Sequence, residues 1–219
     1  VMAALPDGAF TVVYLDPPFN TGRVQTRPTM TSKQTDGEGR SGFRGLRYKA
    51  VFEAAAAYDD RFADYWAFLE PRLAEAWRLL ADDGTLYLHL DYREVHYAKV
   101  LLDVLFGRER FLNEIVWAYD YGARSKKRWP PKHDSILVYV KDPQRYWFDS
   151  SAVDREPYMA PGLVTPEQRE RGKLPTDVWW HTIVSPTGAE RTGYPTQKPI
   201  GVLRRIVAAS TRPGDRVLD

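Results

Sequence analysis

Residues 10–20 read FTVVYLDPPFN, an apolar run that stops at an acid and two prolines. Its first six residues are apolar or β-branched without alternation, which is typical of a strand buried on both faces of a parallel sheet. Pro17 and Pro18 have no backbone N–H donor and end that strand. The stretch therefore predicts a buried strand whose carboxyl end carries Asp16 and Phe19, at the edge where open α/β sheets bind ligands.

Helical and strand patterns alternate along the rest of the chain. Apolar residues at steps of three and four predict the helices, and short apolar runs after turns predict the strands. The predicted helices are 63–81, 94–106 and 200–209; the predicted strands are 85–90, 216–219 and an antiparallel pair at 113–117 and 135–140, with a turn at 82–84. Pro71 either lies within the first helix or starts a second one. This alternation predicts an α/β doubly wound domain with a less regular insert.

Composition limits the chemistry that this chain can carry. Its 219 residues, 43% hydrophobic and 27% charged, contain no apolar run near 18 residues, which indicates a soluble globular domain without a membrane span, signal peptide or lipid anchor. The chain has no cysteine, which excludes disulfides, thiolate zinc sites and a cysteine nucleophile and fits a reducing, cytoplasmic setting. The four histidines lie far apart, so no metal site is predicted.

The segment from Asp16 to Phe19 combines groups that suit the chemistry of an amino group on an aromatic base. Such a nitrogen is a poor nucleophile because its lone pair is delocalised into the ring. The Asp16 carboxylate and the Pro17 carbonyl could accept both amino hydrogens and favour a tetrahedral nitrogen, and Phe19 could stack on the base. In the alternative interpretation, Asp16 caps a turn and Phe19 belongs to the core.

Two sequence blocks resemble a known family, the amino-group DNA methyltransferases. Its catalytic motif, D/N/S-P-P-Y/F/W, stands here as DPPFNTG at 16–22, and its second block stands as YPTQKP at 194–199, followed by a helical pattern and by PGDRVLD at 213–219. The catalytic block comes first, which is the order of the permuted β class. The resemblance implies a Rossmann-like methyltransferase fold and methyl transfer from S-adenosylmethionine to a flipped-out base, favouring N6 of adenine over N4 of cytosine.

The resemblance also implies roles for individual residues. The catalytic residues would be Asp16, Pro17, Pro18 and Phe19, and the cofactor-binding residues would be Asp16, Thr196, Gln197, Lys198 and Asp219. For Lys198 the alternative is a helix N-terminal residue without a ligand. No covalent enzyme intermediate is implied, which agrees with the lack of cysteine, because methylation at cytosine C5 uses a cysteine nucleophile.

Double-stranded DNA is the expected partner, and local basic patches must provide its affinity because the net charge is only +2. Residues 23–49 carry seven basic residues against two acidic ones and lack periodicity, which predicts a mobile basic loop at 23–50. The candidate DNA contacts are Arg23, Arg27, Arg44, Arg47 and Lys49 in that loop, and Arg124, Lys126, Lys127, Arg128, Trp129 and Lys132 in a second segment. The alternative for either segment is a solvated charged face.

The predicted organisation has three parts: a catalytic core at 1–141, a target-recognition insert at 142–190 and the start of a cofactor-binding region at 191–219. The sequence stops at Asp219, where the family continues with the glycine loop P-F-x-G-S-G, so a truncated chain or one part of a split enzyme is expected. A non-catalytic DNA-binding fragment and a methyltransferase for RNA or protein glutamine are the alternatives. A restriction subunit and a second copy of the chain are further candidate partners.

Overall fold

The structure is a computed structural model that describes residues 2–35, 40–41, 47–122, 124–185, 188–194 and 196–219, with the backbone alone described between 25 and 58. A six-stranded sheet forms its centre, in the order β8-β6-β7-β5-β1-β9. These strands are β1 (Phe10–Leu15), β5 (Leu80–Leu90), β6 (Phe111–Ala118), β7 (His133–Val140), β8 (Val178–Trp180) and β9 (Val217–Leu218). The helices are α1 (Tyr65–Leu79), α2 (Val95–Phe106), α3 (Pro166–Arg171) and α4 (Ile200–Ser210), with 3-10 turns at Met2–Ala4, Arg108–Arg110 and Pro161–Leu163.

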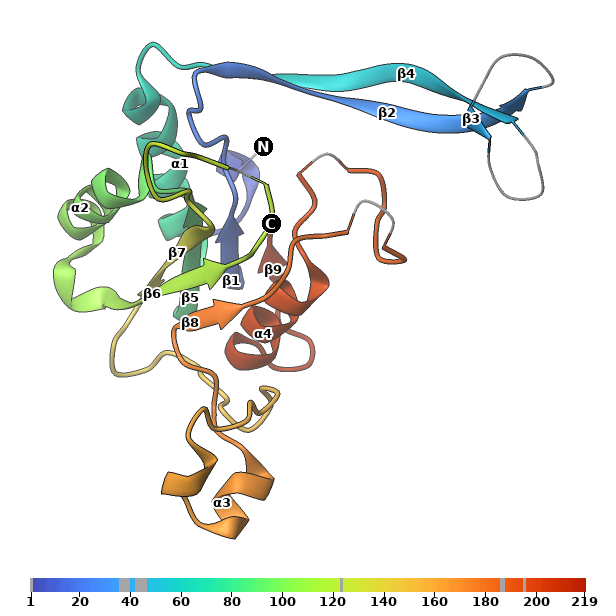
Figure 1. The fold of residues 1–219 in the computed structure, drawn as a ribbon. Helices are drawn as coiled ribbons and strands as arrows, with labels where there is room; N and C mark the ends of the chain where they lie inside the picture. Colours follow the sequence, from blue (N-terminus) through green and yellow to red (C-terminus); the bar gives the residue numbers. More distant parts are fainter. Residues whose placement is uncertain (1, 36–39, 42–46, 123, 186–187, 195) are drawn as a thin grey trace.

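The sheet is mixed, and its pairing confirms the predicted α/β fold. β1 lies parallel to both β5 and β9, and β6 lies parallel to β8. β7 is antiparallel to β5 and to β6, so the predicted antiparallel pair is confirmed. Helices α1 and α2 cover one face of the sheet and α4 covers the other (Figure 1). In the part of the chain that the structure describes, no helix is both long and apolar enough to cross a bilayer.

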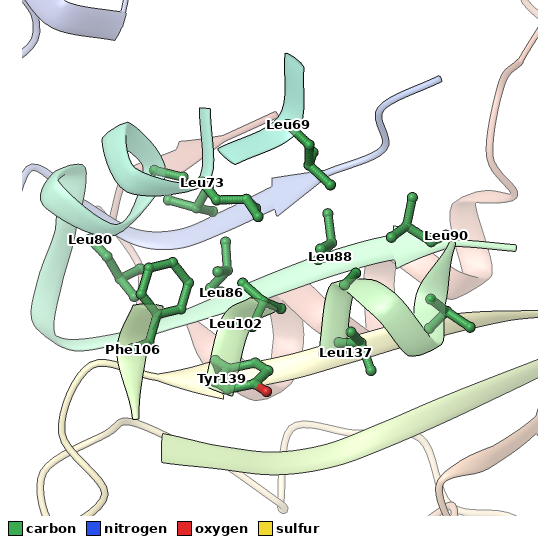
Figure 2. Close-up of a cluster of buried hydrophobic side chains, with 14 of the residues drawn as sticks. Leu69, Leu73, Leu80, Leu86, Leu88, Leu90, Leu102, Phe106, Leu137 and Tyr139 are labelled. Carbon is green, nitrogen blue, oxygen red and sulfur yellow. The ribbon is translucent and has the colours of Figure 1, made fainter. Parts of the chain in front are cut away.

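Alternate residues of the central strands fill two cores, one on each face of the sheet, because successive side chains of a strand point to opposite sides. In β1, Val13 packs under α1 and α2, whereas Val12 and Tyr14 pack under α4. Figure 2 shows the first core, in which alternate leucines of β5 meet residues of both helices. Burial on both faces explains why these strands have continuous apolar sequences.

Helix α1 is a single helix that contains Pro71. Of the two predicted alternatives, Pro71 thus lies within the first helix and does not start a second one. The Asp64 carboxylate caps its first turn by accepting from the backbone N–H groups of Trp66 and Ala67. The helix ends at Leu79, so the prediction that it reaches residue 81 is wrong.

The predicted turn at 82–84 is also wrong, because these residues belong to β5. The register along β1 shifts between the pairs Phe10–Leu80 and Val12–Thr85, so the extra residues form an irregularity within the strand. A Cβ on Gly84 would lie 2.9 Å from the Thr11 carbonyl oxygen, so a glycine is needed at this close approach of two strands.

The predicted loop at 23–50 is contradicted by a β-hairpin. β2 (Arg23–Thr35) and β4 (Arg47–Asp60) pair antiparallel along their whole length, and the short β3 (Arg40–Ser41) pairs antiparallel with the other edge of β4. The hairpin projects away from the body of the molecule (Figure 1). Because a projecting hairpin has no face on a core, its sequence need not alternate between polar and apolar residues, and periodicity does not reveal it. Residues 36–39 and 42–46, which include Arg44, lie outside the described residues.

The predicted insert at 142–190 contains two elements that the sequence analysis missed. Helix α3 has six residues, and β8 has three and extends the central sheet beside β6. Elements this short contain less than two periods of a helix or a strand, so they leave little pattern in the sequence. Trp179 of β8 is buried in the core under α4.

Truncating Leu102 to alanine is expected to lower the free energy of unfolding by about 2–5 kcal/mol, because its side chain is fully buried in α2 and its loss leaves a cavity. Urea unfolding followed by circular dichroism measures the change. Val104→Ala on the same helix is the control, since Val104 is 78% exposed, and an equal loss from both variants would contradict the assigned packing of α2.

Candidate functional site at the carboxyl end of strand β1

The two sequence blocks meet at the carboxyl end of β1. The Lys198 ammonium donates to Oδ2 of Asp16 and, at 3.3 Å, to the backbone oxygen of Thr196. The same ammonium lies 5.6 Å from the centroid of the Phe19 ring. Only 13% of the Lys198 side chain and 19% of the Asp16 side chain are exposed. A lysine from the TQKP block thus contacts both polar and aromatic groups of the DPPF block.

Asp60 holds the turn that follows the DPPF block. Its carboxylate accepts from the backbone N–H groups of Asn20, at 2.8 Å, and of Thr21, at 3.1 Å, and from the Thr21 hydroxyl. Its backbone oxygen accepts from the N–H of Gly22. Asn20 has a φ of +52° and Gly22 one of +72°, so the turn uses left-handed backbone, which Asn and Gly adopt more readily than other residues. Asp60 is 1% exposed.

Two further hydrogen bonds from the helices hold the DPPF block and the turn that follows it. The Tyr65 hydroxyl of α1 donates to the Pro18 carbonyl at 2.7 Å, and the Asn20 side-chain amide donates to Glu94 at the start of α2 at 2.8 Å. The Pro17 carbonyl accepts no hydrogen bond from the described part of the chain.

Under the DPPF block, a buried histidine lies between two carboxylates. His89 of β5 is 0% exposed; its Nδ1 lies 2.7 Å from the Tyr14 hydroxyl and 3.6 Å from Oδ1 of Asp16. Its Nε2 lies 3.3 Å from Oδ2 of Asp134, whose other oxygen accepts from the Tyr119 hydroxyl at 3.1 Å. Burial, with the nearby charge of Asp16, raises the pKa of Tyr14 far above its usual range, so Tyr14 stays a neutral hydroxyl.

A pocket of about 260 Å³ opens beside these groups on the α4 face. Its walls combine aromatic rings with a carboxylate and an ammonium, and they are formed by Trp117, Tyr119, Tyr121, Asp134, Ile183, Val184, Arg191, Tyr194, Thr196, Gln197 and Lys198. Aromatic walls with a few polar groups suit a flat ring that carries hydrogen-bonding atoms. The TQKP block and residues of β6 and β7, among them Trp117 and Asp134, therefore line one cavity.

The predicted cofactor residues take different positions around this edge. Lys198 contacts Asp16, and Thr196 and Gln197 line the pocket. The Gln197 side chain also holds its own loop, because it accepts from the N–H of Thr192 and donates to the carbonyl of Glu190. Asp219 follows β9, and burial together with the charge of Asp16 raises the pKa of its carboxyl above the usual value, although Lys198 opposes this shift.

The predicted DNA contacts are only partly described. Arg23, Arg124, Lys126, Lys127, Arg128 and Trp129 are exposed, with Trp129 at 94%. Lys132 is partly buried and donates to the carbonyl of Gly122. The side chains of Arg27, Arg47 and Lys49 on the hairpin are not described, and Arg44 lies outside the described residues. DNA contact by these residues stays a prediction.

Four residues at the site were missed by the sequence analysis: Asp60, Glu94, Tyr65 and Asp134. Their contacts with Pro18, Asn20, Thr21 and His89 span 39 residues or more, so no local pattern indicates them. His89 is different, because it interrupts the apolar strand LYLHL at 86–90. A histidine in a strand that is buried on both faces needs buried hydrogen-bond partners. Its position in LYLHL therefore indicated a polar site, and this pattern is visible in the sequence.

Comparison with known protein families and with curated proteins finds DNA methyltransferases in each case. A family model described as DNA methylase, N6_N4_Mtase, matches residues 10–219. The chain is 31% identical over 160 residues to the type II methyltransferase M.HpaI of Haemophilus parainfluenzae, covering 72% of this chain and 49% of that protein. It is 29% identical over 223 residues to the DNA adenine methyltransferase YhdJ of Escherichia coli K12, covering 98% and 65%. The chain thus spans about half to two thirds of the length of these curated relatives.

Two solved structures resemble the fold. The PvuII DNA methyltransferase, which is cytosine-N4-specific, has a TM-score of 0.57 at 11% identity and covers 99% of this chain and 68% of that one. A DNA modification methylase from Thermus thermophilus has a TM-score of 0.50 at 21% identity and covers 100% and 74%. At these identities the likeness concerns the fold, and it agrees with the predicted methyltransferase architecture.

Replacing Asp60 with asparagine is expected to lower the free energy of unfolding by roughly 1–3 kcal/mol, because one acceptor oxygen becomes an NH₂ group that faces backbone N–H donors. Chemical denaturation measures this change. Asp59→Asn is a matched control, since Asp59 is the neighbouring residue and its exposed side chain bonds only to Arg61 among the described residues. If the two variants unfolded alike, the assigned anchoring of the turn would be incorrect.

Proposed function

The chain belongs to the family of DNA methylases that modify N6 of adenine or N4 of cytosine, and we propose that it transfers a methyl group from S-adenosylmethionine to N6 of adenine in double-stranded DNA. The observation that carries the proposal is the contact between Lys198 and Asp16, which brings the TQKP and DPPF blocks to one edge of the sheet. The choice of adenine is supported by the aspartate at position 16 and by the similarity to an adenine methyltransferase.

The charges at this edge fit S-adenosylmethionine, which supplies a methyl group from a positively charged sulfonium. Asp16 and Asp219 face the same region, and their mutual repulsion contributes to the raised pKa of Asp219. A ligand that carries a sulfonium and an α-ammonium group would relieve this repulsion. Asp219 and Asp16, with Thr196, Gln197 and Lys198 of the TQKP block, are therefore the residues proposed to hold the cofactor.

The amino group of the target base would be held by the DPPF block. Lys198 occupies Oδ2 of Asp16, and the neighbouring Pro17 carbonyl accepts no hydrogen bond from the described residues. Two acceptors from neighbouring residues, the Asp16 carboxylate and the Pro17 carbonyl, suit an NH₂ group. Accepting both hydrogens would draw the nitrogen lone pair out of conjugation with the ring and so make the nitrogen nucleophilic. S-adenosylmethionine would supply the methyl group: the S–CH₃ bond would break with its electron pair left on sulfur, the N–CH₃ bond would form, and one amino proton would be released.

A flipped base also needs a place to bind, and the pocket beside Asp134 provides aromatic walls for it. Phe19 is partly buried and tilts against the His89 ring, which fixes the orientation of the Phe19 ring next to Asp16. Stacking on Phe19 is therefore compatible with the packing. The alternative in which Phe19 is only a core residue is supported by its contact with the core under α1 and α2.

DNA would approach the same edge. The hairpin β2–β4 begins directly after the DPPFNTG block, and the exposed basic segment at 124–128 follows β6. A two-stranded β-ribbon fits the major groove of B-DNA, and exposed lysines and arginines contact phosphates. Residues 142–190 are proposed to contribute to target recognition, and a restriction subunit and a second copy of the chain are proposed as further partners.

Asp16→Ala is expected to reduce methyl transfer by at least about 100-fold, because it removes both an acceptor for the amino group and the partner of Lys198. Incorporation of labelled methyl groups into duplex DNA measures this, and nucleoside analysis of the product separates N6-methyladenine from N4-methylcytosine. Asp82→Ala, an exposed aspartate near the start of β5 and outside the proposed site, is the control. Full activity of the Asp16 variant would disprove the catalytic assignment.

The same assay distinguishes the remaining alternatives. Methyl transfer to RNA or to protein glutamine, without transfer to duplex DNA, would favour one of the other substrate classes. DNA binding without any methyl transfer, and without saturable binding of S-adenosylmethionine in a calorimetric titration, would favour a non-catalytic DNA-binding protein.

Replacing both Lys126 and Lys127 with alanine is expected to weaken binding to all duplex sequences and to reduce the slope of log affinity against log salt concentration by up to about two, because each phosphate contact releases close to one counterion. Fluorescence anisotropy with labelled duplexes at several salt concentrations measures the slope. Arg108→Ala, an exposed change just before β6, serves as the control. An unchanged slope in the double variant would exclude this segment from the interface.

A further inference from the structure

A row of four polar side chains crosses the sheet beneath the DPPF block. Tyr14 comes from β1, His89 from β5, Asp134 from β7, and Tyr119 lies just after β6. The residues next to them on this face, such as Trp117 and Ile136, belong to the core under α4. Burying polar side chains at the end of an apolar core lowers stability unless each of them forms hydrogen bonds. The hydrogen bonds among these four side chains are therefore expected to have a role.

The positions of the acceptors determine how His89 is protonated at Nε2. Asp134 offers only acceptor oxygens when ionised, and one of them already accepts from Tyr119. An unprotonated Nε2 would place its lone pair against the other oxygen, and two acceptors would face each other in a buried site. With Asp134 ionised, this pairing points to a hydrogen on Nε2 that is donated to Asp134, and Nδ1 forms its hydrogen bond with the Tyr14 hydroxyl.

The His89 ring also connects the catalytic block to the wall of the pocket. Its centroid lies 5.5 Å from that of Phe19 and 5.6 Å from that of Trp117, which lines the pocket. Its Nδ1 edge faces Oδ1 of Asp16, and its Nε2 edge faces Asp134, another pocket residue. The fully buried His89 ring thus contacts Asp16 and Phe19, two of the groups proposed to meet the base. It also contacts Trp117 and Asp134, which line the cavity proposed to receive that base.

We propose that His89 is a positioning residue, which rests on the proposed function: through its Nε2–H bond to Asp134 and its contacts with Asp16 and Phe19, it aligns the pocket for the base with the catalytic block. It does not contact the reacting atoms and transfers no proton. Its function is to fix the distance between the wall that holds the ring of the base and the acceptors that hold its amino group. A displacement of about 1 Å between such groups costs about 100-fold in rate.

Three variants separate positioning from packing. His89→Phe keeps an aromatic ring but loses both polar contacts, and we expect kcat for duplex DNA to fall by about 100-fold with little change in KM. His89→Gln keeps an N–H donor near the position of Nε2 and should recover most of the lost kcat. His96→Phe makes the same substitution at an exposed position of α2 and should leave both constants unchanged. A fall of kcat in His89→Phe without recovery in His89→Gln would overturn the proposal, as would an effect confined to KM.

A spectroscopic measurement tests the proposal without any activity assay. The chain has four histidines, so ¹⁵N-labelled imidazoles give a small set of signals, and His89→Gln identifies the one from His89. We expect its Nε2 to be protonated and protected from exchange, and we expect that protection to be lost in Asp134→Ala. An unprotonated Nε2, or protection that persists in Asp134→Ala, would overturn the proposal. If the unmodified protein transfers no methyl group to DNA, the proposed function fails, and this measurement still decides the hydrogen bond.

Discussion

The ion pair between Asp16 and Lys198 is the constraint on which the site depends. Lys198 precedes α4, and Asp16 follows β1, so the pair forms only when α4 packs on the face of the sheet that β1 helps to build. Placing two opposite charges in a largely buried position costs desolvation that their attraction only partly offsets. Hydrophobic contact between α4 and β1 already holds these elements together. The pair therefore contributes more to aligning two sequence blocks than to the stability of the fold.

The same alternation that builds the two cores also places the polar groups of the site. Tyr14 and His89 occupy strand positions that point toward α4, as do the apolar residues Val12 and Tyr87 two positions earlier in each strand. On the face under α4, the row of Tyr14, His89, Asp134 and Tyr119 thus lies at the sheet edge that carries the DPPF block, where β1 and β5 end and β7 begins. The opposite face, under α1 and α2, carries Leu86, Leu88 and Leu90 of β5 in its core (Figure 2). The pocket beside Asp134 opens at this polar edge of the face under α4.

Elements and site residues could be predicted from the sequence where their pattern is local, and could not where they are defined by contacts with residues far away in the chain. β1, α2 and α4 were predicted closely because each carries its own pattern, either burial on both faces or one apolar stripe. The hairpin β2–β4 was not predicted, because its strands pair with each other and do not pack on a core that would impose an alternating pattern. Within the site, the motifs indicated Asp16 and Lys198, but nothing local to Asp60 indicated that it binds a turn 40 residues away.

The position of Asp60 has a structural consequence for the hairpin as well as for the turn. It is the last residue of β4 and pairs with Arg23, the first residue of β2, so it closes the base of the hairpin. Its carboxylate simultaneously holds Asn20 and Thr21, which directly follow the DPPF block. A rotation of the hairpin about its base must therefore move those backbone N–H groups relative to the carboxylate, or break their hydrogen bonds. The Tyr65 hydroxyl holds Pro18 independently from α1, so the base of the hairpin and the end of β1 have separate anchors. Because Asp16 is paired with Lys198, which precedes α4, the proposed catalytic carboxylate is positioned by the sheet and α4 and not by the hairpin.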